Sequence, residues 1–590
     1  MKYPELTEIY TSRETIDVFG GYNHNLRIGA GEFYDMKNMT SDDYPVLSPR
    51  KQRGVYSSLA NPVGLIAKDA VCHVNGTKFY INGEAVDGLT LSATTIDKPK
   101  TLVSMGAYVI ILPDRMYVNT EKPTDHGSID ATKPTQKIFC SLCKIDGSEY
   151  PDATNSDTAP AEPKNLDLWM DTSGATPVLR QYAATSGEWV SVATTYIRVY
   201  SAGSGIGELF SVGDGITIKA ATAEDQVKLK GIEEHSVVWG TPDKDSIVIT
   251  GIISTAYIAD VEVTFARKMP DMDFVIEAGN RLWGCKYGLS HDGVAVNEIY
   301  ASKLGDFKNW NCFAGISTDS YAASVGTDGQ FTGAITHLGY PIFFKENCIH
   351  KVYGNFPANF QIQTTTCRGV QKGCERSLAI VNETLFYKSR TSVCAYDGSL
   401  PTEVSSALGD VQYSNAVAGV LGNKYYISMK EAGGDYSLFV FDTKKGMWHR
   451  EDDTQAVAFC TNKGDLFYID NVTDGADNIK TVLGTGTLDT SPVEWEAITG
   501  IIGTDSPDKK YISRMDVRLS LNVGTRVSIF ADYDSLGSWE HLFSMTGTTL
   551  RNFAIPIRPK RCDHLRLKIM GVGEAKIFSI TKTVEQGSDV

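Results

Sequence analysis

The feature that most constrains the fold is a repeat of about 40 residues in the second half of the chain. Four short apolar segments align on one aromatic residue each, and Phe344, Phe386, Tyr425 and Phe467 lie 42, 39 and 42 residues apart. Turn-forming residues bound these segments, which is typical of strands joined by tight turns. A period near 40 with several short strands per unit is typical of β-propeller blades. The sequence therefore predicts an all-β protein built around a β-propeller of about six or seven blades.

The spacing is interrupted upstream, where Trp283 lies far from Ile110. Leaving out residues 137–267 restores a step of 42 residues between these two positions, whereas the step from Trp283 to Phe344 is 61 residues and indicates a longer loop. Within the omitted stretch, a Pro/Asp/Thr/Ala-rich linker at 150–163 precedes several strand-like segments joined by turn residues. Residues 137–267 are therefore predicted to be an inserted β module.

The pattern changes again from about Pro492. The segments 514–519, 526–530 and 564–569 alternate apolar and polar residues, as the half-buried strands of a sandwich do. The predicted domains are an N-terminal arm with the first strands (1–65), the first part of the propeller (66–136), the inserted β module (137–267), the second part of the propeller (268–490) and a C-terminal β-sandwich (491–590).

Charge and cysteine usage exclude several classes of protein. The formal net charge is −15 and no long Lys/Arg run occurs, so tight nucleic-acid binding is not expected. The N-terminal residues lack the apolar core of a signal peptide, and no stretch approaches the ~18 apolar residues of a membrane span. The 11 cysteines are dispersed and odd in number. We therefore expect folding in a reducing cytoplasm, with free thiols and no membrane span.

Residues that resemble catalytic or metal-binding motifs have simpler interpretations. Gly203–Gly207 is predicted to be a turn between strands, since a phosphate-binding loop needs a helix N-terminus behind it. Cys140 and Cys143 form a lone C-x-x-C without a second pair of ligands. Asp271 and Asp273 could share one face of a strand as a glycosidase pair, but a turn into a blade also explains them. The sequence thus predicts no catalytic residue, no metal site, no cofactor and a protein that is not an enzyme.

Three aromatic residues of the inserted module, Trp169, Tyr182 and Trp189, are the candidate binding residues. Flat rings can stack on the apolar faces of sugars, so these residues are candidates for contact with a glycan. Aromatic side chains also dominate the cores of small β modules. Both interpretations remain open at the level of the sequence.

Two ordered sets of residues carry a resemblance to a known family. The first set is Phe19-Gly20-Gly21-Tyr22-Asn23, Gly31–Met39 and Tyr44–Arg50; the second is Asn280-Arg281-Leu282-Trp283-Gly284, Glu298–Asp306, Trp310, Phe343-Phe344-Lys345, Ile349–Gly354, Gly369 and Cys394–Gly398. In this order they resemble β-propeller virion proteins of tailed bacteriophages, including podophage tail nozzles and packaged-DNA stabilisation proteins. The Trp169–Trp189 segment is similar to small modules of phage tail and fibre proteins. The resemblance brings no catalytic residue with it.

The resemblance implies a structural component of a tailed-phage virion, made in the host cytoplasm and placed in the tail, nozzle or neck. Its expected partners are other copies of itself in a ring, other phage tail or neck proteins, and translocating DNA in passive contact. A lining that faces DNA is expected to be acidic or neutral, because basic residues would hold the phosphates. The alternative is a tail protein that binds a host-surface glycan.

Overall fold

The computed structural model describes residues 11–291, 293–471, 478–489, 491–503, 509–547, 551–555 and 560–585. In these ranges the helices are short: the one-turn helices α1 (Ile206–Leu209) and α2 (Ala223–Gln226), and three 3-10 turns. All other regular structure is β-strand, so the prediction of an all-β fold is confirmed. No helix in the described part of the chain is long and apolar enough to cross a membrane.

Seven four-stranded blades form the β-propeller within the described ranges: five are separate sheets, and two are parts of larger sheets. The first two are β7 (Pro62–Ala67), β8 (Val71–Asn75), β9 (Lys78–Ile81) and β10 (Glu84–Ala85), then β11 (Thr101–Met105), β12 (Tyr108–Leu112), β13 (Met116–Asn119) and β14 (His126–Ser128). The next two are β27 (Phe274–Ala278), β28 (Arg281–Leu289), β29 (Ala295–Ala301) and β30 (Tyr321–Ser324), then β31 (Phe331–His337), β32 (Tyr340–Lys345), β33 (Cys348–Tyr353) and β34 (Gln361–Thr366).

The remaining three blades follow in the same way. They are β35 (Ala379–Val381), β36 (Thr384–Lys388), β37 (Val393–Tyr396) and β38 (Thr402–Glu403); β39 (Tyr413–Leu421), β40 (Lys424–Glu431), β41 (Tyr436–Asp442) and β42 (Met447–Arg450); and β43 (Ala456–Asn462), β44 (Asp465–Asp470), β45 (Ile479–Thr481) and β6 (Gly54–Ser57), with β46 (Thr487–Leu488) paired to β6.

The chain divides into two compact units, described separately below. The first comprises residues 1–102, 344–349 and 365–590, and the second comprises residues 103–343 and 350–364. The blades β7–β10, β35–β38, β39–β42 and β43–β45 with β6 lie wholly in the first unit. The blade β27–β30 and the inserted module lie wholly in the second.

The aligned positions of the sequence repeat all fall on the second strand of a blade. Phe344, Phe386, Tyr425 and Phe467 lie in β32, β36, β40 and β44, and each is at most 4% exposed. In the first unit, the rings of Phe386 and Tyr425 pack with centroids 5.3 Å apart. The repeat of about 40 residues is thus the repeat of the aromatic positions that fill the blade cores.

An N-terminal strand completes the last blade. β43, β44 and β45 come from residues 456–481, whereas the fourth strand, β6, comes from residues 54–57 and pairs antiparallel with β45. Chain segments more than 400 residues apart therefore share one sheet, which ties the start of the propeller to its end.

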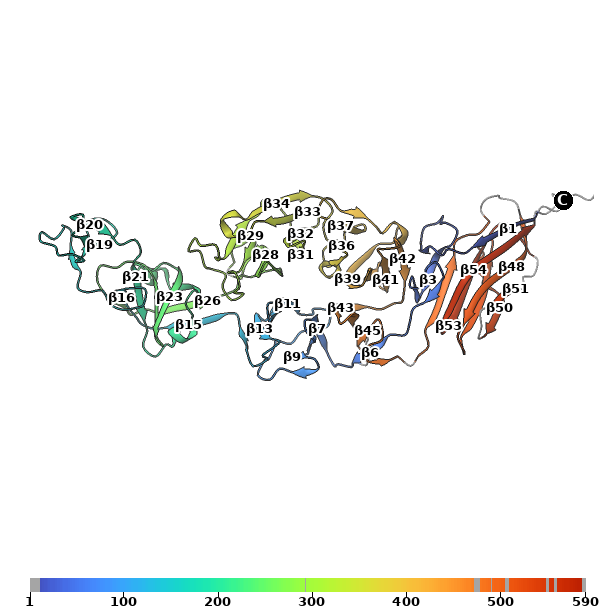
Figure 1. Cartoon of the computed structure of the whole chain (residues 1–590), viewed down its shortest axis with the longest axis horizontal. Coiled ribbons are helices and arrows are strands. Elements are labelled where there is room, and N and C mark those ends of the chain that lie inside the picture. The colour runs from blue at the N-terminus through green and yellow to red at the C-terminus, as the bar shows by residue number, and fades with distance from the viewer. Residues whose placement is uncertain are drawn as a thin grey trace, which may run out of the picture. The chain divides into compact units, whose positions relative to one another are not determined.

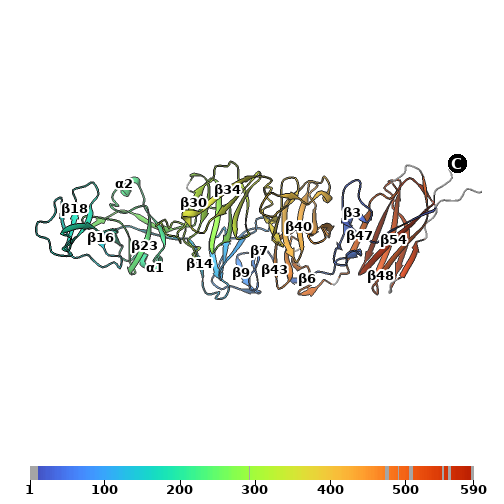
Figure 2. The same ribbon diagram turned by 45° about the horizontal axis from the view of Figure 1, so that its top comes forward.

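A second set of N-terminal strands joins a blade to the sandwich. β2 (Gly21–Tyr22) pairs with β42, and β3 (Glu32–Lys37) pairs with β2 and with β47 (Glu494–Thr499) (Figure 2). On its other side β47 pairs with β53 (Leu565–Val572), and β49 (Arg526–Tyr533) and β50 (Glu540–Thr546) follow in the order of the sheet. Blade β39–β42 and one layer of the sandwich are therefore a single ten-stranded sheet (Figure 1).

The other layer of the C-terminal sandwich has the order β1 (Thr11–Ile16), β54 (Ala575–Glu585), β48 (Lys510–Leu521) and β51 (Arg551–Ile555), with β52 (Arg561–Cys562) also paired to β48. The predicted alternation appears in β53, where Leu565, Leu567 and Ile569 are buried and the residues between them are half-buried. The first described residues, 11–16, pair with β54 and so belong to this sandwich sheet. Residues 1–10 of the predicted N-terminal arm lie outside the described residues.

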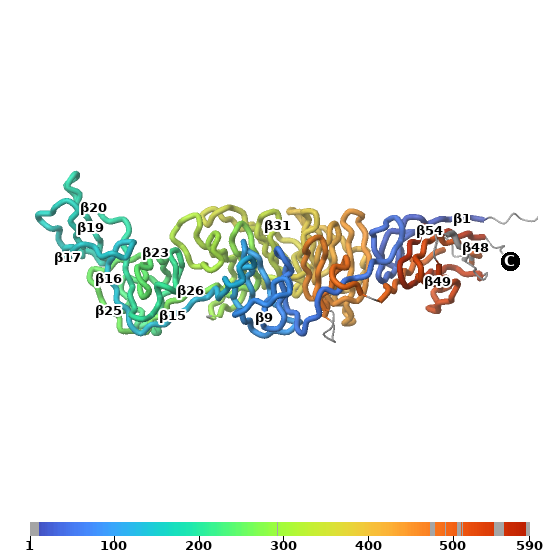
Figure 3. The backbone as a smooth tube through the Cα atoms, turned by 60° about the horizontal axis from the view of Figure 1, so that its bottom comes forward, coloured from blue at the N-terminus to red at the C-terminus, as the bar shows by residue number. Residues whose placement is uncertain are grey.

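The inserted module begins and ends with two paired strands of the second unit. β15 (Ala131–Thr135) and β26 (Val263–Arg267) run antiparallel and side by side (Figure 3). The sequence placed the start of the module at residue 137, inside the loop that follows β15. The module contains an eight-stranded sheet with a core of mainly aliphatic residues together with Phe210 and Phe265. It also contains a smaller sheet, β17 (Thr154–Ser156), β18 (Leu168–Asp171), β19 (Val178–Ala183) and β20 (Glu188–Ser191).

Candidate functional site

The structure brings the three aromatic residues predicted from the sequence together on the small sheet. Trp169 lies in β18, Tyr182 in β19 and Trp189 in β20, with Tyr182 directly opposite Trp189. The centroid of the Trp189 ring is 5.6 Å from that of Trp169 and 5.3 Å from that of Tyr182. Arg180, which pairs with Trp169 across the sheet, places its guanidinium 5.6 Å from the centroid of the Trp169 ring.

These rings lie on the face of the sheet opposite to its hydrophobic core. Successive side chains of a strand point to opposite faces, so Leu168 and Met170 lie on the other face from Trp169. Leu168, Met170 and Leu179 form a buried cluster that packs against partly buried apolar residues of the module. Trp169 is 8% exposed beneath its neighbours, whereas Tyr182 and Trp189 are half-buried. The aromatic face (Trp169, Tyr182 and Trp189) is therefore a separate layer with two accessible rings.

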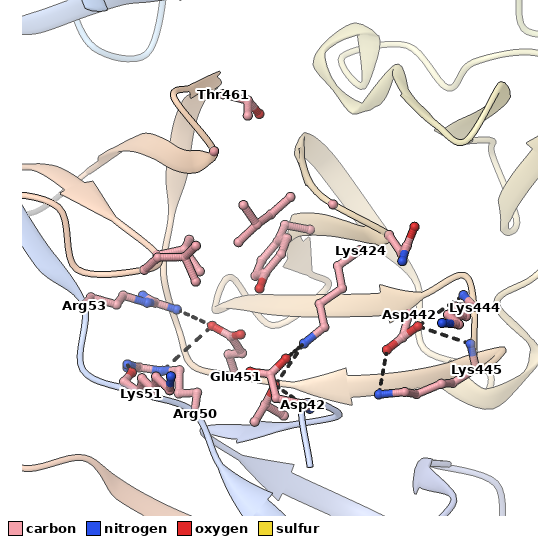
Figure 4. Close-up of a pocket in the computed structure, with 18 residues that line it drawn as sticks. Asp42, Arg50, Lys51, Arg53, Lys424, Asp442, Lys444, Lys445, Glu451 and Thr461 are labelled. Atoms are coloured by element: carbon pink, nitrogen blue, oxygen red, sulfur yellow. Dashed lines mark hydrogen bonds and ion pairs between the residues drawn. The ribbon is translucent and has the colours of Figure 1, made fainter. Parts of the chain in front are cut away.

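A second candidate site, which the sequence did not indicate, is a basic pocket of about 640 Å³ in the first unit (Figure 4). Its lining comes from the N-terminal segment 40–53 and from the blades β39–β42 and β43–β45. It contains six cationic side chains, Arg50, Lys51, Arg53, Lys424, Lys444 and Lys445, and three acidic ones, Asp42, Asp442 and Glu451. The less polar part of the lining is formed by Tyr426, Leu421, Val482 and Leu483.

The arginines of this basic pocket are engaged in a buried ion-pair network. Nη2 of Arg53 lies 2.7 Å from Oε2 of Glu451, and its Nη1 lies 2.8 Å from Oδ2 of Asp452. Arg50 lies 3.2 Å from the same Asp452 oxygen. Burial raises the pKa of Asp452, but the charges of Arg53 and Arg50 outweigh it and lower this pKa to about 2. These two arginines therefore anchor the N-terminal segment to the blade.

The two cation clusters of the pocket could not be linked from sequence. Arg50-Lys51 and Arg53 lie almost 400 residues from Lys444-Lys445, and only the fold places them around one space. Each cluster alone looks like an ordinary solvated charge pair. The sequence signal is the local excess of Lys and Arg in an acidic chain, and it is too short to identify a site.

A larger cavity of about 1080 Å³ lies in the second unit. Aromatic residues of its lining are Tyr196, Trp239, Tyr257 and Phe313, and the indole of Trp239 donates to the hydroxyl of Thr250 at 2.9 Å. The Tyr257 hydroxyl donates to the carbonyl of Lys230 at 2.9 Å. Phe313, from the loop between β29 and β30, is 57% exposed. Tyr196, Trp239 and Tyr257 belong to the inserted module, which thus has aromatic surface in two places.

The motif-like residues are occupied by internal contacts. Lys286 lies 3.1 Å from Asp271 and 2.9 Å from Asp273, so one ammonium compensates both carboxylates. Cys140 and Cys143 are both buried in β16 (Ile138–Cys143), where burial raises each thiol pKa to about 11. In the described part of the chain, no group of three or more His, Cys, Asp or Glu side chains could hold a metal ion.

One local prediction was wrong. Gly203–Gly207 was expected to lie between strands, but the one-turn helix α1 begins at Ile206. The backbone N–H groups of Gly203 and Gly205 donate to the Asp245 carboxylate at 3.0 and 2.8 Å. An internal carboxylate therefore occupies the anion-binding N–H groups of this loop.

No protein-family model and no curated protein matches the chain. Among solved structures it is similar to an exo-β-1,3-galactanase from Phanerochaete chrysosporium (8% identity, 52% of this chain and 94% of that chain, TM-score 0.22). It is also similar to a GH43 glycoside hydrolase described as having endo-xylanase and exo-arabinofuranosidase activity (10% identity, 53% and 98%, TM-score 0.21) and to a Trypanosoma rangeli sialidase (9% identity, 97% and 95%, TM-score 0.20).

These similar proteins are enzymes, and this finding contradicts the prediction that the chain is not an enzyme. The prediction rested on missing motifs, and glycosidases place their carboxylates by three-dimensional geometry rather than in a short motif. The prediction is therefore withdrawn. Identities of 8–10% and TM-scores of 0.20–0.22 assign no substrate and no activity to this chain.

Proposed function

We propose that the chain is a structural component of a tailed-phage particle that assembles with copies of itself, and with other tail or neck proteins, into a ring. The observation that carries this proposal is the ten-stranded sheet, in which N-terminal strands fuse a blade to the sandwich. Main-chain hydrogen bonds, rather than a flexible linker, connect these two parts of the first unit. A connection of this kind suits a rigid building block.

The residues that resemble the phage proteins serve this architecture. Tyr22 and Phe33 are 4% and 1% exposed in β2 and β3. Gly21 has a φ of +85°, and a Cβ there would lie 2.5 Å from the carbonyl oxygen of Trp448. Only glycine combines this backbone conformation with so close an approach of the neighbouring strand.

Arg281, from the second set of residues, has a similar role in the second unit. It is 2% exposed, and its guanidinium donates to the carbonyl oxygens of Ser302 at 2.8 Å and Ser317 at 2.9 Å, and also to that of Asp319. It thereby holds the long loop between β29 and β30 against the blade. The second set thus contributes a buried scaffold contact, as a structural role requires.

The experiment has two arms. Particles of a phage that encodes the chain are purified on a density gradient and analysed by mass spectrometry, and the purified chain is measured by mass photometry and negative-stain microscopy. We expect the chain in the particles, and either closed rings of the chain alone, with a mass that is a multiple of 64.4 kDa, or heavier rings after mixing with neighbouring tail proteins. Absence from infectious particles would refute the proposal.

A second function, binding of a host-surface glycan, is supported by the aromatic face of the inserted module. Its rings lie away from the core cluster, and Trp189 and Tyr182 remain partly accessible. A solvent-facing aromatic layer of this kind fits the apolar face of a sugar ring.

The test uses Trp189→Ala, with Val190→Ala as the matched control. Val190 follows in the same strand, points to the other face and is 53% exposed. We expect Trp189→Ala to bind isolated host cell-wall glycan about tenfold more weakly, equivalent to about 1.4 kcal/mol, with Val190→Ala unchanged. Equal binding by Trp189→Ala and the parent chain would eliminate this second function.

A further inference from the structure

Several lysine side chains of the basic pocket take little or no part in its ion-pair network. The side chains of Lys51 and Lys444 are exposed, and their ammonium groups have no hydrogen-bond or ion-pair partner among the described residues. Nζ of Lys424 uses two of its three donors, on Asp42 at 2.7 Å and on Thr40 at 3.0 Å. Nζ of Lys445 donates to the carbonyl oxygen of Ser41 and lies 3.5 Å from Asp442. Several ammonium donors therefore remain for a ligand.

Arg53 forms part of the buried wall of the pocket and offers no donor to a ligand. Its side chain is 7% exposed, and both Nη atoms are engaged. Its Nε–H has no hydrogen-bond partner among the described residues, but it is closed off from solvent. The donors open to a ligand are therefore the lysine ammonium groups at the exposed rim.

The charge balance of the basic pocket is positive in a chain whose net charge is −15. The lining has six cations and three acids. Asp452 neutralises one more charge through Arg50 and Arg53, which leaves an excess of two positive charges. A phosphate group carries about −1.5 to −2 at pH 7, which matches this excess.

We propose that the basic pocket is a binding site for a phosphate-bearing small molecule. Both guanidinium forks are committed to carboxylates, so the free donors are lysine ammonium groups. These act as point charges and are a common means of binding phosphate. The volume of about 640 Å³ lies within the range of small-molecule sites, and Leu421, Val482 and Leu483 offer apolar wall for the rest of the ligand. The proposal is independent of the structural role above.

The test is calorimetric titration of the full chain with sodium pyrophosphate at low ionic strength. We expect saturable binding of one pyrophosphate per chain, weakened by added salt because the rim is exposed. Lys51→Ala combined with Lys444→Ala should weaken it at least about tenfold, since each removes a charge-assisted contact. The matched control is Lys78→Ala with Lys98→Ala, two exposed lysines of the same unit outside the pocket, which should bind as the parent does.

Three outcomes would overturn the proposal. They are no saturable binding by the parent chain, equal binding by the Lys51/Lys444 variant, and tighter binding of acetate than of pyrophosphate. The ammonium groups of these two exposed lysines make no hydrogen bond or ion pair within the described residues, so their removal should not unfold the chain; circular dichroism checks this. As a second measurement, Lys424→Met, which removes a partly engaged ammonium, should also weaken pyrophosphate binding.

Discussion

Removal of the Arg53 charge is the most direct test of the ion-pair network that anchors the N-terminal segment. Arg53 is 7% exposed and contacts Glu451 and Asp452, whose side chains are 4% and 17% exposed. Its Nη1 also donates to the Tyr468 hydroxyl at 2.8 Å. Arg53→Met retains most of the apolar stem but leaves two buried carboxylates with only Arg50 to compensate them.

The expected cost follows from the loss of one partner of a buried pair, about 3–5 kcal/mol. The pKa of Asp452, lowered from 3.8 to about 2, corresponds to roughly 2 kcal/mol, which is of the same order. Since the folded pKa is the lower one, this stabilisation is fully present above about pH 4 and is lost as the pH falls towards 2. For a cooperative unit of more than 300 residues, each kcal/mol lowers Tm by about 1–2 °C, so Arg53→Met should lower it by roughly 3–10 °C.

The assay is differential scanning calorimetry at pH 7. The control is Arg13→Met, because Arg13 is 66% exposed and lies 3.7 Å from Asp516, and loss of such a surface pair should cost less than about 1 kcal/mol. Adding Glu451→Gln to Arg53→Met should recover part of the loss, because Asp452 then stays paired with Arg50 and no buried carboxylate is left unpaired. A Tm within about 2 °C of the parent for Arg53→Met would refute the reasoning; no recovery in the double variant would assign the cost to packing instead of charge.

Three further predictions follow from single residues. Gly21→Ala should destabilise the chain by about 1–3 kcal/mol, because φ is positive and the new Cβ would lie 2.5 Å from the carbonyl oxygen of Trp448. In the same melting assay Gly446→Ala, where φ is also positive but the new Cβ meets open space, should cost about 1 kcal/mol or less. Burial, together with the positive charge of Lys424, lowers the pKa of His449 to about 3, so this side chain stays neutral in the folded chain at a pH at which the unfolded chain binds a proton, below about 6.5. Tm should therefore fall as the pH is lowered from 7 to 5. If His449→Gln has the same dependence of Tm on pH as the parent, this prediction is wrong. All 11 cysteines should react with a thiol reagent after unfolding. Alkylation of the folded chain at pH 8 should be slow, because burial raises the thiol pKa to about 11 at Cys140 and at Cys367. Addition of a chelator should leave Tm unchanged.

The blade cores were predictable because their signal is local and periodic. Four blades carry a buried aromatic residue on the second strand, in β32, β36, β40 and β44, at steps of about 40 residues. The sandwich strands were predictable for a similar reason, since one buried layer imposes a period of two. Both signals depend on a few consecutive residues and survive without knowledge of the partner strands.

The sites were less predictable because they depend on which strands become neighbours. Trp169, Tyr182 and Trp189 could be selected as aromatic residues, but only the register of β18–β20 shows that they share a face opposite to Leu168 and Met170. The basic pocket required residues 40–53 to meet residues 421–483, a pairing that no local pattern encodes. Composition even argued against it, because the excess of acidic residues hides a local excess of cations.

The N-terminal segment explains why the resemblance near the start of the chain is informative about architecture. Residues 11–57 supply β1 to the sandwich, β2 and β3 to the ten-stranded sheet and β6 to the last blade. The segment also carries Arg50 and Arg53, whose ion pairs with Glu451 and Asp452 fasten it where it passes from one sheet to the next. The segment between β3 and β6 is held by contacts along its length: β4 (Met39–Thr40) pairs with β5 (Ser48–Pro49), and Lys424 forms an ion pair with Asp42. A force on the sandwich would therefore be transmitted to the blade through β-sheet hydrogen bonds and ion pairs. A glycine or aromatic change in this segment should therefore disturb sandwich and blade together, which is how a coupling element differs from a linker.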